Sequence, residues 1–172
     1  RDLHSFPTRR SSDLLVREDG WRVALPSELE WEKAARGGLR GAVFPWGDEA
    51  DDGDGRRANH AGSGIGDTSV VGCFAANGHG LHEMAGNVWE WTRSLWGSVI
   101  WKPDFAYPYP IDDPRREDLR AGDEVRRFVR GGSWNDPRDL ARCGIRSGAL
   151  PAVCDVHVGF RVVLRSSPVL PL

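Results

Sequence analysis

Arg130–Trp134 (RGGSW) and Gly159–Val163 (GFRVV) delimit the last quarter of the chain. Both ends have the sequence pattern of β-strands that pair with neighbouring strands in a defined way. The 24 residues between Trp134 and Gly159, numbers 135–158, show almost no periodicity. Irregular segments held between strands usually lie on the surface, where binding and catalytic residues concentrate. The sequence therefore predicts a functional surface at 134–158, either an active site or a binding face.

Length and composition predict one globular domain. A chain of 172 residues can bury one real core, and 21 Gly with 11 Pro indicate many turns and few long helices. The net charge of −2 argues against a nucleic-acid partner, since phosphate backbones require a basic surface. No apolar run reaches the length needed to span a membrane. We expect a soluble domain without a membrane span.

The cysteines are sparse and odd in number, which does not fit a disulfide framework. They are Cys73, Cys143 and Cys154. A Cys143–Cys154 disulfide is an alternative, but buried thiols are the favoured interpretation. The compartment stays open, with the cytoplasm as the favoured expectation.

The beginning of the chain has an unusual sequence. Residues 4–14 resemble one reading frame of a common sequencing adapter, so we expect 1–14 to be a read artefact. A genuine basic N-terminal arm is the alternative. The predicted organisation is an artefact at 1–14, a truncated domain at 15–165 and a C-terminal tail at 166–172, with upstream domains missing.

The clearest local element is a helix over Pro26–Gly38. Ser27 and Glu30 have the spacing of a capping box, and Gly37 can adopt the left-handed conformation that ends a helix. Strands are predicted at 21–25, 88–92 and 125–130. The connection 93–123 is rich in aromatic residues, so we expect it to pack on the domain rather than form a disordered linker.

Two stretches of the sequence are candidates for binding a hard cation such as calcium. The acidic run 48–55 is reminiscent of a calcium loop but lacks the bidentate Glu of an EF-hand, so a solvated loop is favoured. Glu83 and Glu90 flank a Gly-Asn turn whose carbonyl groups could converge on a cation. Two exposed carboxylates are an equally weighted alternative.

Six motifs occur in order along the chain: LPSELEWEKAARGG (25–38), PWGD (45–48), GL (80–81), GNVWEW (86–91), RGGSW (130–134) and GFR (159–161). Together they resemble the formylglycine-generating enzyme family, also called sulfatase-modifying factors. The resemblance covers about residues 21–165 and implies an α+β, C-type-lectin-like fold with short strands, few helices and much ordered loop.

The resemblance also implies calcium as a structural cofactor. Glu83 and Glu90 would supply carboxylate oxygens, and Gly86 and Val88 backbone oxygens. A second calcium site would begin at Asn59 and His60, but the loop after these residues is shorter than in the family, so its other ligands cannot be placed.

The resemblance does not extend to the copper chemistry of the family's oxidases. Those enzymes bind copper through two cysteines shortly after Gly-Gly-Ser, because copper(I) prefers soft sulfur ligands. Here the first cysteine position is Asp136, and the second falls in a stretch about three residues shorter, without a cysteine. Cys143 matches a non-catalytic cysteine of the family. We therefore do not expect a copper cofactor or an active formylglycine-generating oxidase.

Two further branches of the family bear on function. Iron-dependent sulfoxide synthases take their metal ligands largely from another domain, of which this sequence has nothing. Variable proteins of diversity-generating retroelements vary in their C-terminal segment by mutation of adenines in Asn codons. Such mutation cannot produce Glu, Lys, Gln, Met or Trp, and residues 135–158 contain none of the five. The chance probability is roughly one in twenty, and ordinary drift is the alternative.

The leading hypothesis is a non-catalytic, bacterial recognition module that displays a variable surface at 134–158 to a protein or small-molecule ligand. The alternatives are a formylglycine-generating-type oxidoreductase or related enzyme with different active-site chemistry, and an accessory domain of a larger signalling or defence protein. The predicted ligand-binding residues are Trp134, Asn135, Asp136, Arg138, Asp139, Arg142, Arg146, Asp155 and His157.

Overall fold

A computed structural model describes residues 13–16, 21–49, 56–108 and 110–166. The predicted artefact 1–14 lies outside this part except for Asp13 and Leu14, and the predicted tail lies outside it except for Ser166. Most of the acidic run 48–55 is also outside the described residues.

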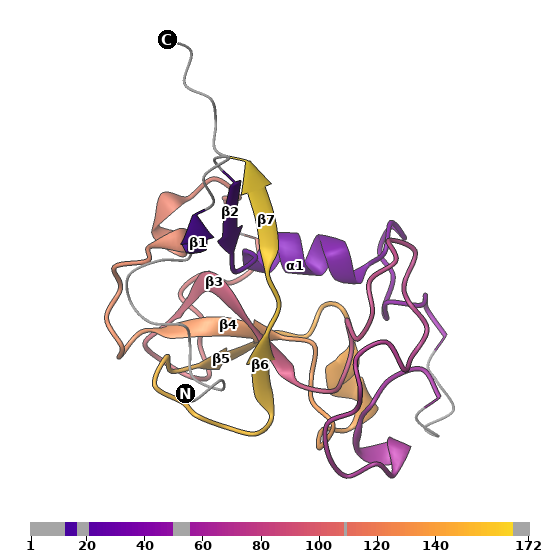
Figure 1. Cartoon of the computed structure of the whole chain (residues 1–172). Coiled ribbons are helices and arrows are strands. Elements are labelled where there is room, and N and C mark those ends of the chain that lie inside the picture. The colour runs from indigo at the N-terminus through magenta and orange to yellow at the C-terminus, as the bar shows by residue number, and fades with distance from the viewer. Residues whose placement is uncertain (1–12, 17–20, 50–55, 109, 167–172) are drawn as a thin grey trace.

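The described residues form two small sheets and one α-helix (Figure 1). The first sheet has the order β1-β2-β7, with β1 Asp13–Val16, β2 Trp21–Ala24 and β7 Val163–Ser166, all antiparallel. The second has the order β5-β4-β3-β6. Its strands are β3 Trp89–Gly97, β4 Arg126–Arg130, β5 Ser147–Ala149 and β6 Val158–Phe160. The predicted α+β fold with short strands, few helices and much loop is confirmed.

The helix forms as its local sequence predicts, although it is shorter. Helix α1 covers Glu28–Ala35, and the Ser27 hydroxyl accepts a hydrogen bond from the backbone N–H of Glu30. The Glu30 carboxylate accepts one from the backbone N–H of Ser27, which completes the capping box. Gly37 has a φ of +58°, as expected for a helix stop.

The closing segment differs from the prediction at both ends. Strand β4 ends at Arg130, and RGGSW is a turn because Gly131 and Gly132 have φ values of +102° and +75°. The second end, GFRVV, is divided between two strands. Strand β6 pairs in parallel with β3, whereas β7 pairs with β2 in the other sheet. Figure 1 shows this segment running from one sheet to the other beside α1.

The segment between these ends is also less irregular than predicted. It contains a short 3₁₀ helix, η3 Arg138–Ala141, and strand β5, which pairs with β4. Two more 3₁₀ helices, η1 Ala61–Ser63 and η2 Pro114–Glu117, lie in the earlier loops.

The long connection packs on the domain, as predicted. Its first residues extend β3 to Gly97, so the strand is longer than 88–92. Its 3₁₀ helix η2 carries Arg116, whose side chain is 1% exposed and contacts Glu28 of α1.

Glu28 is fully buried, and its carboxylate is surrounded by three guanidinium groups. The closest nitrogen lies at 3.2 Å for Arg116, 3.4 Å for Arg130 and 2.5 Å for Arg146. These arginines come from η2, from the end of β4 and from the residue before β5. Burying charges is costly, so each depends on its partners remaining in place.

We predict that Glu28→Gln destabilises the fold by about 3–5 kcal/mol, because it leaves buried guanidinium groups without their carboxylate. Urea unfolding measures the change. The matched control is Glu124→Gln at an exposed position, for which we expect less than about 0.5 kcal/mol. Equal effects of the two substitutions would contradict this role of Glu28.

Candidate functional site

The RGGSW turn is held closed by Asp136. Its Oδ2 accepts hydrogen bonds from the Ser133 backbone N–H at 2.9 Å, from the Ser133 hydroxyl at 2.6 Å and from Trp89 Nε1 at 2.8 Å. A single carboxylate oxygen thus connects the turn to the first residue of β3. Oδ2 of Asp136 is therefore engaged in internal bonds, and its predicted contact with a ligand stays a prediction.

Four other predicted residues lie on the surface around η3. Asn135, Asp139 and Arg142 are exposed, and the Arg138 side chain is 40% exposed. Arg142 Nε donates a hydrogen bond to the backbone carbonyl of Asp139 at 2.8 Å. This bond fixes the Nε end of the guanidinium group. These four residues have the accessibility that a ligand face requires.

Trp134, Asp155 and His157 form a second group on the same segment. The rings of Trp134 and His157 have centroids 4.9 Å apart and are tilted by 34°. His157 Nδ1 lies 2.5 Å from Asp155 Oδ1, which also accepts the backbone N–H of His157. This backbone hydrogen bond is the main cause of the lowered pKa of Asp155, and the His157 side chain lowers it further.

The strand β3 region anchors this group through its backbone. The N–H of Trp89 donates to the His157 carbonyl at 2.7 Å, and the N–H of Trp134 donates to the Asn87 carbonyl at 2.9 Å. Trp134 Nε1 and His157 Nε2 are buried without a hydrogen-bond partner among the described residues. Buried polar atoms of this kind are uncommon in folded proteins.

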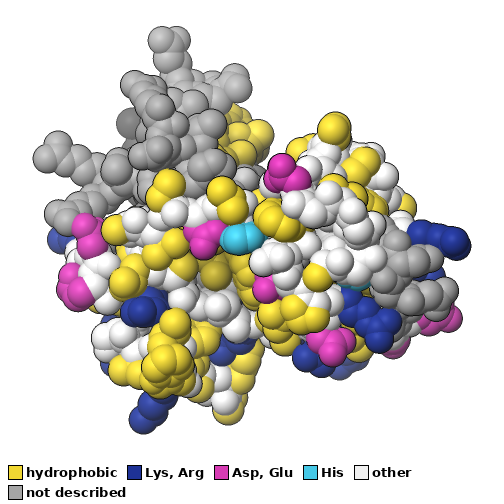
Figure 2. All heavy atoms as spheres, turned by 90° about the horizontal axis from the view of Figure 1, so that it is seen from below, with side chains coloured by type: hydrophobic (Ala, Val, Ile, Leu, Met, Phe, Trp, Pro, Cys, Tyr) yellow, Lys and Arg dark blue, Asp and Glu magenta, His cyan; other side chains and the backbone are white. Residues whose placement is uncertain are grey.

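Figure 2 views the molecule from the side of the β5–β6 connection. Hydrophobic side chains are frequent on this face, and a histidine lies beside an acidic side chain near its centre (Figure 2). A mixture of apolar area with a few polar groups is typical of a recognition surface.

Arg146 does not belong to this surface. Its Nε and NH2 groups bond to the buried Glu28 carboxylate at 2.5 Å and 2.9 Å, and its guanidinium lies over the rings of Tyr107 and Phe128. The prediction that Arg146 meets a ligand is corrected accordingly: it is part of the internal ion-pair cluster.

The predicted calcium ligands lie around the Gly-Asn turn. Glu83, Val88 and Glu90 border one cavity of about 400 Å³. The Glu90 carboxylate also receives Arg161 in a bidentate pair, at 2.5 Å and 2.6 Å, and the Trp31 indole N–H at 2.6 Å. Glu83 accepts the backbone N–H of Gly72 through both oxygens. Both carboxylates thus accept hydrogen bonds from the protein, and Arg161 borders the same cavity. Calcium at this turn stays a prediction from sequence.

Gly86 is required in this turn because a side chain would not fit there. It has a φ of +70°, and a Cβ at this position would lie 2.1 Å from the Asn59 carbonyl oxygen. The turn receives the N–H of Trp134 and donates to the carbonyls of Asn59 and Gly131. Only glycine allows these segments to meet so closely.

The second predicted calcium site has its side-chain atoms already engaged. Asn59 Oδ1 accepts the Ser63 hydroxyl at 2.9 Å, and its amide donates to the Asp67 carbonyl at 2.8 Å. His60 Nδ1 accepts the backbone N–H of Gly62. Within the described part of the chain, no group of three or more His, Cys, Asp or Glu side chains could hold a metal. The second site stays a prediction from sequence.

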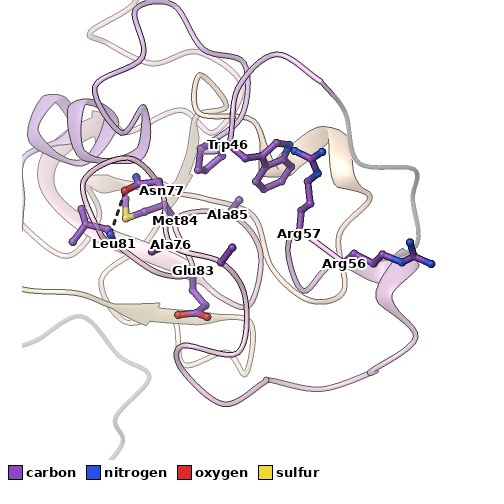
Figure 3. A pocket seen from close by; sticks show the side chains of 11 residues that line it. Trp46, Arg56, Arg57, Ala76, Asn77, Leu81, Glu83, Met84 and Ala85 are labelled. Atoms are coloured by element: carbon purple, nitrogen blue, oxygen red, sulfur yellow. Dashed lines mark hydrogen bonds between the residues drawn. The ribbon is translucent and has the colours of Figure 1, made fainter.

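Another pocket, of about 190 Å³, lies on the other side of the chain segment that carries Glu83 (Figure 3). Trp46, Met84 and Ala85 surround it, and the Arg57 guanidinium lies 6.0 Å from the centre of the Trp46 ring. The Glu83 carboxylate points away from Trp46 (Figure 3). The residues predicted from sequence to bind a ligand do not line this pocket.

All three cysteines are free thiols, so the alternative Cys143–Cys154 disulfide is excluded. Cys143 is buried as predicted, whereas Cys73 and Cys154 are exposed. Burial raises the pKa of the Cys143 thiol to about 11. It therefore remains protonated at neutral pH, whereas a metal ligand or nucleophile must be a thiolate.

The family comparison agrees with these motifs. The sulfatase-modifying factor enzyme 1-like domain matches residues 2–166. The chain belongs to this family. The match begins inside the segment 1–14 that the adapter resemblance marks as foreign, and that assignment stays a prediction.

Relatives of the sulfatase-modifying factor domain include active and inactive proteins. The formylglycine-generating enzyme of Streptomyces coelicolor is 37% identical over 150 residues, which cover 80% of this chain and 45% of that protein. The inactive C-alpha-formylglycine-generating enzyme 2 of Bos taurus is 34% identical over 155 residues, covering 82% and 44%. The chain thus spans less than half the length of either relative.

The fold is shared with a solved structure, Treponema denticola variable protein 1. The TM-score is 0.66 at 28% identity, and the match covers 82% of this chain and 47% of that one. This agrees with the C-type-lectin-like fold and the variable-protein branch expected from the sequence. Among the residues that the structure describes, no helix is long and apolar enough to cross a membrane.

Sequence reasoning missed two arginines of this sulfatase-modifying factor domain. Arg161 pairs with Glu90, and Arg36 lines a cavity with Arg142. Arg161 lies in the GFR motif, but no local signal identifies its partner 71 residues earlier.

Proposed function

We propose that this chain is a non-catalytic ligand-binding module of the sulfatase-modifying factor family, with its ligand face at 134–158. The observation that carries the proposal is Asp136. It stands where the sequence resemblance locates the first copper cysteine, and its carboxylate closes the turn through three internal hydrogen bonds. A hard carboxylate engaged in this way does not replace a thiolate as a copper(I) ligand.

The properties of Cys143 support the same conclusion. Its thiol is fully buried, and its carbonyl accepts a hydrogen bond from Arg130 at 2.7 Å. Because its pKa is raised to about 11, it does not supply a thiolate near neutral pH. The relatives include an inactive enzyme, and the fold is shared with a variable protein, which supports a non-catalytic role.

The proposed ligand face combines exposed and half-buried residues. Asn135, Arg138, Asp139 and Arg142 give polar contacts around η3, while Trp134 and His157 give a ring pair held by backbone bonds. Rigid aromatic anchors with a polar rim are typical of binding surfaces. A protein or small-molecule ligand is bound through this face.

An array of immobilised peptides and glycans tests the face directly. We expect the chain to bind at least one array member, and Asn135→Arg to abolish this binding by adding bulk and charge at an exposed position of the face. The matched control is Ser98→Arg, exposed just beyond the other end of β3, which should bind like the wild type. An array without any ligand that depends on position 135 would contradict the proposal.

The same proposal includes calcium as a structural cofactor. Glu83 and Glu90 would bind it through carboxylates and Gly86 and Val88 through backbone oxygens, since the two carboxylates and Val88 border one cavity. Bound calcium would stabilise the turn that joins Asn59, Gly131 and Trp134.

Removal of calcium should lower the unfolding temperature, because a metal that binds only the folded state stabilises it by about 2.7 kcal/mol at 100 times Kd. Thermal unfolding with calcium and with a chelator measures this difference. Glu83→Gln should abolish the response and Glu124→Gln should preserve it. An unchanged unfolding temperature after chelation of the wild type would rule out this site.

A further inference from the structure

A cavity of about 350 Å³ lies between the end of α1 and the segment that follows η3. Its walls include Arg36, Val43, Arg142, Gly144 and Ile145. The backbone N–H of Cys143 donates to the Val43 carbonyl at 2.8 Å, which ties the two sides of the cavity together. Two arginines from distant parts of the sequence therefore line one cavity.

The Arg36 guanidinium is held rigidly at the edge of this space. Its Nε and NH2 groups donate to Glu32 Oε1 at 3.1 Å and 2.7 Å, and NH1 donates to the Ala42 carbonyl at 2.6 Å. The hydrogen bonds to Glu32 are the main cause of the raised pKa of Arg36. The group is charged and oriented before any ligand arrives.

Arg36 shares its acidic partner with another arginine, because Glu32 pairs with both Arg36 and Arg130. Arg142 donates Nε to the backbone carbonyl of Asp139. No acidic side chain is among the described residues that line the cavity.

Gly144 lies in the wall of the cavity, and the space where its side chain would be is empty. A Cβ at this position would have no neighbour within 4 Å, and its φ lies outside the left-handed region. A side chain can therefore be introduced here without backbone strain or a clash with the wall.

We propose that this cavity is an oxyanion site, which binds a carboxylate or phosphate group between Arg36 and Arg142. Arginine is suited to this because its planar group of donors matches the geometry of both anions. Since Arg142 lies in the ligand face 134–158, the inference rests on the proposed function and names one chemical group of the ligand.

Inorganic phosphate and acetate are the probes, titrated at constant ionic strength while the backbone amide signals of Arg142 and Gly144 are followed by NMR. We expect saturable shifts at both signals with at least one of the two anions. The anion that binds more tightly distinguishes a phosphate-bearing from a carboxylate-bearing ligand.

Gly144→Asp provides the sharpest test, because it adds a carboxylate to the wall of the cavity that both arginines line. It should weaken anion binding at least about tenfold, whereas Gly144→Asn, of the same shape without the charge, should retain it. Arg142→Gln should also weaken binding about tenfold, and Arg120→Gln, at an exposed position elsewhere, should leave it unchanged.

Absence of saturable shifts in the wild type would overturn the oxyanion site, as would equal binding by Gly144→Asp and Gly144→Asn. Neither result would affect array binding that depends on Asn135. Conversely, loss of the array result with intact phosphate or acetate binding would refute the wider ligand face and leave the anion site. The two failures are therefore distinguishable.

Discussion

The buried carboxylate of Glu28 is the interaction on which the rest of the fold depends. It has no solvent exposure and contacts Arg116, Arg130 and Arg146. The backbone N–H of Glu28 donates a hydrogen bond to the Ser94 hydroxyl of β3 at 2.9 Å. One residue of the short helix thereby joins the second sheet, the long connection and the closing segment. In a domain with so little regular structure, these polar contacts define the relative positions of the helix, the sheet and the long loops.

This cluster explains how the closing segment can combine a fixed position with an exposed surface. Arg130 is the first residue of the RGGSW turn and Arg146 stands immediately before β5, and both bond to Glu28. The loop between them is thus held at both ends by the same carboxylate. Within the loop, Asp136 closes the turn, and Asn135, Asp139 and Arg142 are exposed around η3. Substitutions among those exposed residues change the surface without removing what positions it.

Local sequence rules predicted the helix well because its determinants are neighbours: Ser27 and Glu30 are three residues apart. Sequence motifs also predicted the fold class. The inward orientation of Arg146 was not predictable from local sequence, because its partner Glu28 lies 118 residues away. Asp136 has a local partner in Ser133, but its bond to Trp89 joins residues 47 positions apart. Arg161 likewise pairs with Glu90, 71 residues earlier. A residue in a surface segment can therefore be structural, and only its long-range partner reveals this.

The central claim is that the family's oxidase chemistry has been lost at Asp136 while the scaffold around it has been kept. Oxygen consumption, measured with copper(I) and a cysteine-containing peptide, tests this claim most directly. The account predicts a rate equal to that of the same mixture without the protein, and an unmodified peptide cysteine. Sustained oxygen uptake with conversion of that cysteine to formylglycine would contradict it.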